Sequence, residues 1–119
     1  MKPARHSPTQ EQGQAAEQRA LQFLQERGCR LVQANFQCKV GEIDLIVRDG
    51  PVLVFVEVRE RAGATHGGAA ASITRVKIGR LVRAAQTYLQ RCPSVPPCRI
   101  DVIAIDAGRI DWLRDAIQV

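Results

Sequence analysis

The sequence has few aromatic residues, few histidines and no closely spaced pair of cysteines. Five aromatic residues occur in 119 positions, and the two histidines stand far from the four cysteines, none of which form a C-x-x-C pair. The scarcity of aromatics disfavours a stacking platform for single-stranded bases, and the cysteine spacing disfavours a zinc ribbon or a redox pair. We therefore interpret Cys29, Cys38, Cys92 and Cys98 as reduced packing residues, with a Cys92–Cys98 disulfide as the less favoured alternative.

The sequence also lacks a long apolar run and a secretory leader. Its first ten residues, MKPARHSPTQ, include basic residues but are followed by no apolar segment, so we expect a cytoplasmic protein that does not enter a membrane. Hydrophobic residues make up 45% and charged residues 24% of the chain, which is ordinary globular composition. The length fits one domain. We expect a flexible N-terminal tail over residues 1–8 and a single domain over residues 9–119.

The charge balance is basic. Lysine and arginine number 17 against 12 acidic residues, which gives a net charge of +5. Such a balance favours polyanionic partners, because phosphate contacts release counterions. The nucleic-acid-binding residues that we expect are the basic residues after the central strand and along the second helix: Arg61, Arg75, Lys77, Arg80 and Arg83.

Hydrophobic periodicity predicts the order helix, three strands, helix, two strands. The first helix starts near Ser7 and stops at Gly28, and the second starts at Ser72 or Thr74. The predicted strands cover residues 30–37, 42–48, 52–58, 99–105 and 109–113, and residues 61–71 form a glycine-rich loop. The strand over 52–58 is apolar on both faces and is predicted to be central. The fold class is therefore α/β, with a mixed central sheet and helices packed on it.

The second and third strands carry acidic residues where an apolar core is expected. We predict Asp49-Gly50 as the two-residue turn of a hairpin. In that register Arg48 faces Pro51, Asp44 lies opposite Phe55, and Glu42 lies opposite Glu57. Because side chains alternate along a strand, Glu42, Asp44, Glu57 and Arg59 then share one face of the sheet.

Carboxylates gathered on one face repel each other unless a positive charge is present. A hard divalent cation, Mg²⁺ or Mn²⁺, supplies that charge, and Asp44, Glu57 and Glu42 are its predicted ligands. Such an ion assists phosphodiester hydrolysis. In the alternative interpretation the acids are ordinary strand-end residues, with Glu57 paired to Arg59 or Arg61 and the other two facing solvent.

Several motifs together resemble the YraN family of bacterial proteins, relatives of the PD-(D/E)xK nucleases that are similar in core to archaeal Holliday-junction resolvases. The matching motifs are GEIDLI, FVEV, Gly13-x-x-x-Glu17, Asn35-Phe36, Arg61, Gly67, Lys77 and Arg99-Ile-Asp101-Val. They cover nearly the whole chain after the tail. The resemblance implies a restriction-endonuclease-like core.

The resemblance also implies roles for individual residues. Asp44 and Glu57 would bind the metal, Glu17 of the first helix would assist, and Arg59 would occupy the position of the motif lysine. Arginine is always protonated but binds phosphate oxygens well. Lys39 and Lys77 are the candidates to replace the missing lysine.

Three hypotheses remain open. In the first, the protein is a Mg²⁺-dependent endonuclease that acts on DNA in preference to RNA, including branched or structured DNA. In the second, it is a catalytically degenerate nucleic-acid-binding module, with Arg59 in place of the motif lysine. In the third, it is a scaffold for another protein. Whether two copies form a homodimer also stays open, and Trp112 and Leu113 are expected either to cover a sheet edge or to meet a second subunit.

Overall fold

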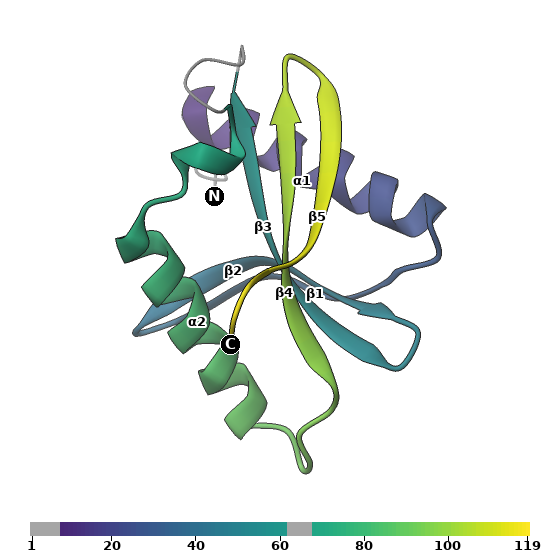
Figure 1. Cartoon of the computed structure of the whole chain (residues 1–119), viewed down its shortest axis with the longest axis vertical. Helices are drawn as coiled ribbons and strands as arrows, with labels where there is room; N and C mark the ends of the chain where they lie inside the picture. The colour runs from purple at the N-terminus through teal and green to yellow at the C-terminus, as the bar shows by residue number, and fades with distance from the viewer. Residues whose placement is uncertain (1–7, 62–67) are drawn as a thin grey trace, which may run out of the picture.

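A computed structural model describes residues 8–61 and 68–119, which form a five-stranded mixed sheet with one helix on each face (Figure 1). The elements are α1 (Pro8–Glu26), β1 (Arg30–Cys38), β2 (Gly41–Asp49), β3 (Val52–Arg61), the short 3-10 helix η1 (Ala70–Ser72), α2 (Arg75–Gln90), β4 (Cys98–Asp106) and β5 (Arg109–Ile117). The predicted order is confirmed. Residues 1–7 of the predicted tail lie outside the described residues, as do residues 62–67, which include Gly67 of the predicted loop.

The sheet has the strand order β1-β2-β3-β4-β5, so the predicted central position of β3 is confirmed. Its β3 and β4 strands run parallel and the other neighbours run antiparallel, which makes the sheet mixed as predicted. The crossover between the parallel strands includes α2, because parallel neighbours cannot be joined by a tight hairpin.

Two apolar layers hold the helices to the sheet. On one face Ala16, Ala20 and Leu24 of α1 pack in the same cluster as Val54 and Val56 of β3. On the other face, the cluster contains Leu81, Ala84, Ala85 and Leu89 of α2 together with Phe55 of β3 and Ile46 of β2. Because β3 is covered on both sides, successive side chains along it alternate between the two layers.

Local sequence signals set the ends of the helices. Gly28 has φ +93° and follows α1, and the Cys29 N–H donates to the Leu24 carbonyl while the Gly28 N–H donates to the Gln25 carbonyl. This is the Schellman pattern, which favours glycine. At the start of α2 the Thr74 hydroxyl accepts a hydrogen bond from the Lys77 N–H at 3.2 Å. The predicted stop at Gly28 and the predicted cap at Thr74 are confirmed.

The predicted register of the β2–β3 hairpin is wrong by two residues. Asp49 pairs with Val52, so the turn consists of Gly50, with φ +61°, and Pro51. The reason is that proline has no N–H to give to the ladder and is better placed in the turn. The predicted opposite pairs Arg48–Pro51, Asp44–Phe55 and Glu42–Glu57 are therefore not formed; Arg48 lies opposite Leu53 and Ile46 opposite Phe55. A shift of two residues keeps the paired side chains of 45–49 and 52–56 on their predicted faces.

The β2 and β3 strands separate beyond the pair Leu45–Val56, which is the last in their ladder. From there β2 continues beside β1 to the pair Cys38–Gly41, and β3 continues beside β4 to the pair Arg61–Asp106. In Figure 1 the upper part of β3 runs beside β4 while β2 runs away from it. We call this point of separation the fork. Continuing the register by one position puts Asp44 and Glu57 at its two sides.

The end of the predicted glycine-rich loop is better packed than its composition indicates. Gly68 and Ala69 are buried, and the Ala69 N–H donates to Asp106 Oδ1 at 2.7 Å. A Cβ atom on Gly68 would lie 3.0 Å from the Asp106 carboxylate, so the absence of a side chain permits this close approach. The end of the predicted loop over 61–71 is therefore packed against β4, and it includes the start of η1.

All four cysteines are free, which confirms the thiol interpretation and not the Cys92–Cys98 disulfide. Among residues 8–61 and 68–119, no helix combines the length and the apolar character needed to cross a lipid bilayer.

Candidate functional site at the fork of the sheet

The structure brings Asp44 and Glu57 together at the fork. Asp44 Oδ2 accepts a hydrogen bond from the backbone N–H of Val58 at 2.8 Å, so the Asp44 side chain replaces a ladder bond where the strands part. The Asp44 carboxyl group lies close enough to Glu57 to raise the pKa of Glu57 through hydrogen bonding and through its charge. Glu57 is 9% exposed, and within the described chain it is one of only two buried charged residues. Burial of this kind is costly for an acid whose neighbour is another acid.

A local break in the strand pattern presents Asp44 to this point. Ile43 belongs to the apolar layer under α2, whereas Leu45, two residues later, belongs to the layer under α1. Regular alternation would place both on one face. Across the ladder Asn35 has φ +54°, between the pairs Ala34–Leu45 and Phe36–Ile43. Asparagine tolerates this left-handed conformation better than most residues, so the sequence of β1 favours the irregularity at Asn35.

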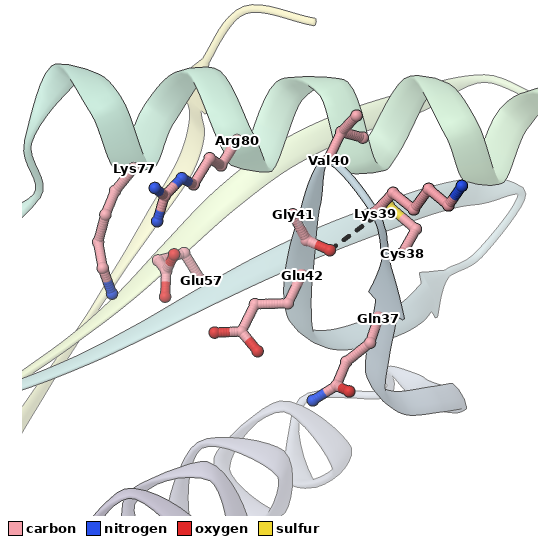
Figure 2. Close-up of a pocket in the computed structure, with 9 residues that line it drawn as sticks. All are labelled: Gln37, Cys38, Lys39, Val40, Gly41, Glu42, Glu57, Lys77 and Arg80. Atoms are coloured by element: carbon pink, nitrogen blue, oxygen red, sulfur yellow. Dashed lines mark hydrogen bonds between the residues drawn. The ribbon is translucent and has the colours of Figure 1, made fainter.

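Two hollows flank the acids. The larger has a volume of about 470 Å³ and is lined by Glu42, Glu57, Lys77 and Arg80 together with the β1–β2 turn, residues 37–41 (Figure 2). The smaller, about 300 Å³, lies between α1 and β1 and is lined by Glu17 and Asn35 among others. We call these the α2 cavity and the α1 cavity. Asp44 interacts with an acid of each, Glu57 and Glu17.

Glycine is required where the β1–β2 turn meets α2. A Cβ atom on Gly41 would clash with the backbone carbonyl of Arg80. The turn therefore packs directly on the helix backbone, and the same turn forms one wall of the α2 cavity. The Cys38 thiol donates to the Gly41 carbonyl at 3.4 Å, as the dashed line in Figure 2 shows.

The electrostatic environment of the acids disfavours their ionised forms. Burial, and then the hydrogen bond and charge of Asp44, raise the pKa of Glu57 from 4.5 to about 9, against the opposing charges of Lys77 and Arg59. Burial, then the charges of Asp44 and Glu42, raise the pKa of Glu17 to about 7, and a hydrogen bond from Asn35 opposes this shift. The charges of Lys77 and Arg59 do not cancel the rise in the pKa of Glu57, and a proton or a cation between the carboxylates would relieve their repulsion.

The donor atoms suit a hard cation, although the ligands are not gathered into a finished site. Within residues 8–61 and 68–119, no three His, Cys, Asp or Glu side chains are grouped so as to hold a metal ion. The pair Asp44 and Glu57, with Glu42 and Glu17 on either side, offers oxygen donors alone. Mg²⁺ characteristically takes one or two carboxylates and completes its shell with waters and substrate phosphate, so the pair fits that ion.

The predicted basic residues lie at different distances from the acids. Lys77 and Arg80 line the α2 cavity with Glu57, whereas Arg75 and Arg83 are exposed elsewhere on α2 and Arg61 is exposed at the end of β3. Arg59 stands two residues after Glu57, and its Nε donates to Ser72 Oγ at 3.1 Å. The guanidinium thus connects β3 to η1.

The alternative interpretation of the acids as strand-end residues is wrong for the pairing of Glu57 and right for Glu42, which is exposed. The ion pairs within the described residues are Arg19–Glu60, Arg99–Asp49, Arg99–Asp101 and Arg109–Asp111, and none involves Glu57.

Trp112 covers neither sheet edge, because its ring packs edge-on against Phe23 of α1 and its Nε1–H donates to Asp101 Oδ2. Leu113 is 39% exposed.

No site role was predicted for Asn35, Gln37 and Gly41, which line the cavities, although Asn35 and Gly41 belong to motifs that resemble the family. An asparagine inside a strand pattern and a glycine at the start of the next strand were the available signals. Neither signal indicates which distant groups the residue will meet.

Comparison with known proteins places the chain in a family. The model of the uncharacterised protein family UPF0102 matches residues 16–105. The chain belongs to this family. UPF0102 proteins of Herminiimonas arsenicoxydans and Cupriavidus metallidurans are 56% and 54% identical over 89% and 95% of this chain, and over 86% and 85% of their own lengths. One from Nitrosomonas eutropha is 50% identical over 94% of this chain and 97% of its own.

Membership of UPF0102 confirms the predicted likeness to the YraN family. The matched segment begins after Gln14 and ends before β5. It therefore contains all four acids of the fork and, apart from Gln14, every residue that lines the two cavities. The part of the chain that the family shares is the part that builds the candidate site.

Proposed function

We propose that this UPF0102 protein is a Mg²⁺-dependent endonuclease that hydrolyses phosphodiester bonds in DNA, including branched or structured DNA. One observation carries the proposal: Asp44 and Glu57 lie on the two sides of a fork in the sheet, where Asp44 accepts from the Val58 N–H, and Glu57 lines a cavity of about 470 Å³ together with Lys77 and Arg80. Acids that repel each other next to cations suit a site that receives both a metal ion and a phosphate.

The residues at the fork would divide the work as follows. Asp44 and Glu57 would hold Mg²⁺ or Mn²⁺, and Glu42 and Glu17 would complete its surroundings. The bound ion would polarise the phosphodiester and lower the pKa of the attacking water. Lys77 and Arg80 on one wall of the α2 cavity would bind phosphate oxygens, and Arg75, Arg83 and Arg61 would hold more distant phosphates of the same DNA.

The test is incubation of pure protein with branched, nicked and linear DNA in Mg²⁺ or Mn²⁺. We expect cleavage that stops with a chelator and that falls about 100-fold or more in Glu57→Gln, since removal of a metal ligand removes the charge stabilisation that the ion provides. Glu60→Gln is the matched control. Glu60 is on the same strand, but it pairs with Arg19 of α1 at 2.9 Å, so this variant is expected to cut like the wild type.

Two results would reject the enzyme. One is the absence of cleavage from every DNA form with either metal, and the other is cleavage that survives Glu57→Gln. Titration of Mn²⁺ by calorimetry gives an independent reading, because Asp44→Asn and Glu57→Gln are expected to weaken the binding that the wild type shows.

A second candidate function is a nucleic-acid-binding module without catalysis. It is favoured by Arg59, which occupies the position of the motif lysine and donates to Ser72. This candidate predicts salt-sensitive DNA binding without turnover, with the salt slope reduced by about one for each phosphate contact removed among Arg75, Arg80 and Arg83. Cleavage restored by Arg59→Lys would favour a catalytic ancestor, and cleavage by the wild type would reject this candidate.

A further inference from the structure

Lysine is rare in this chain, and its placement is selective. The sequence contains fourteen arginines but only three lysines. Lys2 lies outside the described residues, and the other two, Lys39 and Lys77, both line the α2 cavity with Glu42 and Glu57. A chain that uses arginine almost everywhere thus places both described lysines at one cavity.

The arginines of the described chain mostly have structural partners. Arg99 binds Asp49 and Asp101, Arg19 binds Glu60, and Arg48 donates to the Pro51 carbonyl. Arg27, Arg91 and Arg114 lie over aromatic rings. These are the uses that suit a planar guanidinium, whereas a lysine ammonium is a compact point charge that fits a small polar site.

Lys77 is the lysine directed toward the acids. It lies in the first turn of α2, where the Thr74 cap holds its backbone N–H, and its side chain extends toward Glu57 in Figure 2. The charge of Lys77 acts on Glu57 more strongly than that of Arg59, although Arg59 is only two residues away in sequence. Lys39 belongs to the same cavity, but its side chain points away from Glu57 in Figure 2.

We propose that Lys77, supplied by helix α2, is the catalytic amine of the site, and that it replaces the lysine missing from strand β3. Its ammonium lies beside Glu57 and contacts the phosphate that enters the α2 cavity. Arg59 instead holds β3 to η1 through Ser72. This inference rests on the proposed nuclease function, and it assigns the phosphate contact to one side chain.

The position of Lys77 can be tested without any cleavage. Reductive methylation with ¹³C-formaldehyde labels the three lysines and the terminal amine, and Lys39→Arg and Lys77→Arg assign their NMR signals. We expect Glu57→Gln to shift the Lys77 signal, and Mn²⁺ to broaden that signal in the wild type but much less in Glu57→Gln. A Lys77 signal that is insensitive to Glu57→Gln, or that Mn²⁺ broadens equally in both proteins, overturns the inference.

Its catalytic role is tested with Lys77→Arg and Lys77→Ala in the cleavage assay. Both are expected to lower kcat about 100-fold or more, since one positioned donor to the transferring phosphate contributes about that much and the larger planar guanidinium cannot take the place of the compact ammonium. Lys77→Arg keeps the charge and the salt dependence of DNA binding. Arg30→Ala, which removes a charge at the start of β1 and thus at the other end of that strand from the cavity, is the control and is expected to cut normally.

The outcomes separate the inference from the proposed function. If the wild type cuts and Lys77→Arg cuts equally well, the inference fails and the proposed function stands. If the wild type cuts nothing, the proposed function fails and the catalytic role of Lys77 fails with it. Loss of kcat in both Lys77 variants, with normal cutting by Arg30→Ala, supports both.

Discussion

Two buried acids of this protein are held in opposite ways. Asp101 of β4 is fully buried and Glu57 of β3 is 9% exposed. Asp101 accepts hydrogen bonds from Arg99 Nε, from Trp112 Nε1 at 2.9 Å and from the Asp115 N–H at 2.8 Å. Glu57 instead lies beside another acid, Asp44. One carboxylate is surrounded by donors, and the other faces a group of its own charge.

The difference separates an acid whose partners are all supplied by the fold from one that the proposed function makes a metal ligand. Burial lowers the pKa of Arg99, but its hydrogen bonds to Asp101 and Asp49 outweigh burial and raise it. This network joins β2, β4 and β5 and requires no ligand. At the fork Glu57 faces Asp44 instead, and in the proposed function a bound cation would supply the opposing charge.

The largest effect expected at a fixed pH comes from removing Asp101 from its hydrogen-bonded network. Asp101→Ala leaves the Arg99 guanidinium and the Trp112 N–H without their buried acceptor. Removing one partner of a buried ion pair costs about 3–5 kcal/mol, and we expect a fall of that size in the free energy of unfolding, measured by urea denaturation.

Asp111→Ala is the matched control for this change. Asp111 pairs with Arg109 at 3.5 Å with both side chains well exposed, so its removal is expected to change stability by less than about 1 kcal/mol. Equal effects of the two substitutions would show that Asp101 is not the structural acid described above.

The next effect is the dependence of stability on pH. Glu57 has a pKa of about 9 in the folded protein and near 4.5 when unfolded, so between these values the folded state holds a proton that the unfolded state has lost. The contribution of this Glu57 proton to stability is complete below pH 4.5 and is lost as pH rises toward 9. The free energy of unfolding of metal-free protein should fall over this window by up to about 1.4 kcal/mol per pH unit.

Glu57→Gln is expected to flatten that dependence, because glutamine does not titrate. Glu17, whose pKa is about 7, adds a smaller fall at the acidic end of the window. Mg²⁺ should stabilise the wild type most at the alkaline end, where the ionised carboxylates are available to bind it. Chemical denaturation at pH values from 5 to 9, with and without Mg²⁺, measures both effects. An unchanged slope in Glu57→Gln would refute the assignment.

A smaller effect is expected at Asn35, which shapes the strand opposite Asp44. Asn35→Ala should lower the free energy of unfolding by about 1–2 kcal/mol, because alanine is strained at φ +54°. Asn35→Gly keeps the conformation and removes the hydrogen bond to Glu17, so it should raise the pKa of Glu17 with a smaller stability loss. NMR titration of the Glu17 side chain and denaturation measure these outcomes. Equal stability of the two variants would contradict the role of backbone strain.

The smallest effect is expected for Glu60, which lies three residues after Glu57 and on the opposite face of β3. Glu60→Gln breaks only the pair with Arg19, whose side chain is 43% exposed, and should change stability by less than about 1 kcal/mol with little pH dependence. A pH slope altered as much as in Glu57→Gln would remove the contrast between the two faces of the strand. Denaturation across the same pH range makes the comparison.

Much of the fold follows from local patterns that the sequence states directly. Helical spacing with Gly28 and Thr74 at the ends, and a strand that is apolar on both faces, were sufficient for the element order and for the central place of β3. The hairpin register was missed because Asp49-Gly50 is a strong turn signal, and the missing N–H of Pro51 outweighed it. An even error in register does not exchange the faces of a strand, but the break in alternation between Ile43 and Leu45 was not predicted.

The candidate site was likewise predictable only in part from the sequence. Its acids were recognisable from their positions in apolar strands, and their shared face follows from the period of a strand. Such patterns did not predict that β2 and β3 separate beyond the pair Leu45–Val56, or that Asp44 lies between two cavities. They also did not predict that Lys77 approaches from α2. Each depends on how elements distant in sequence pack together.

The amino-acid sequence alone determined which elements form, which of their faces are apolar, and which strands carry carboxylates, because these properties depend on neighbours a few residues apart. Only the tertiary structure decided which acid would be satisfied. Asp101 meets donors from its own strand and from β5, whereas Glu57 meets Asp44 and the lysine of a helix twenty residues away in sequence. The free energy of a buried charge depends on every group within a few ångströms, and those groups are brought together only by the complete fold.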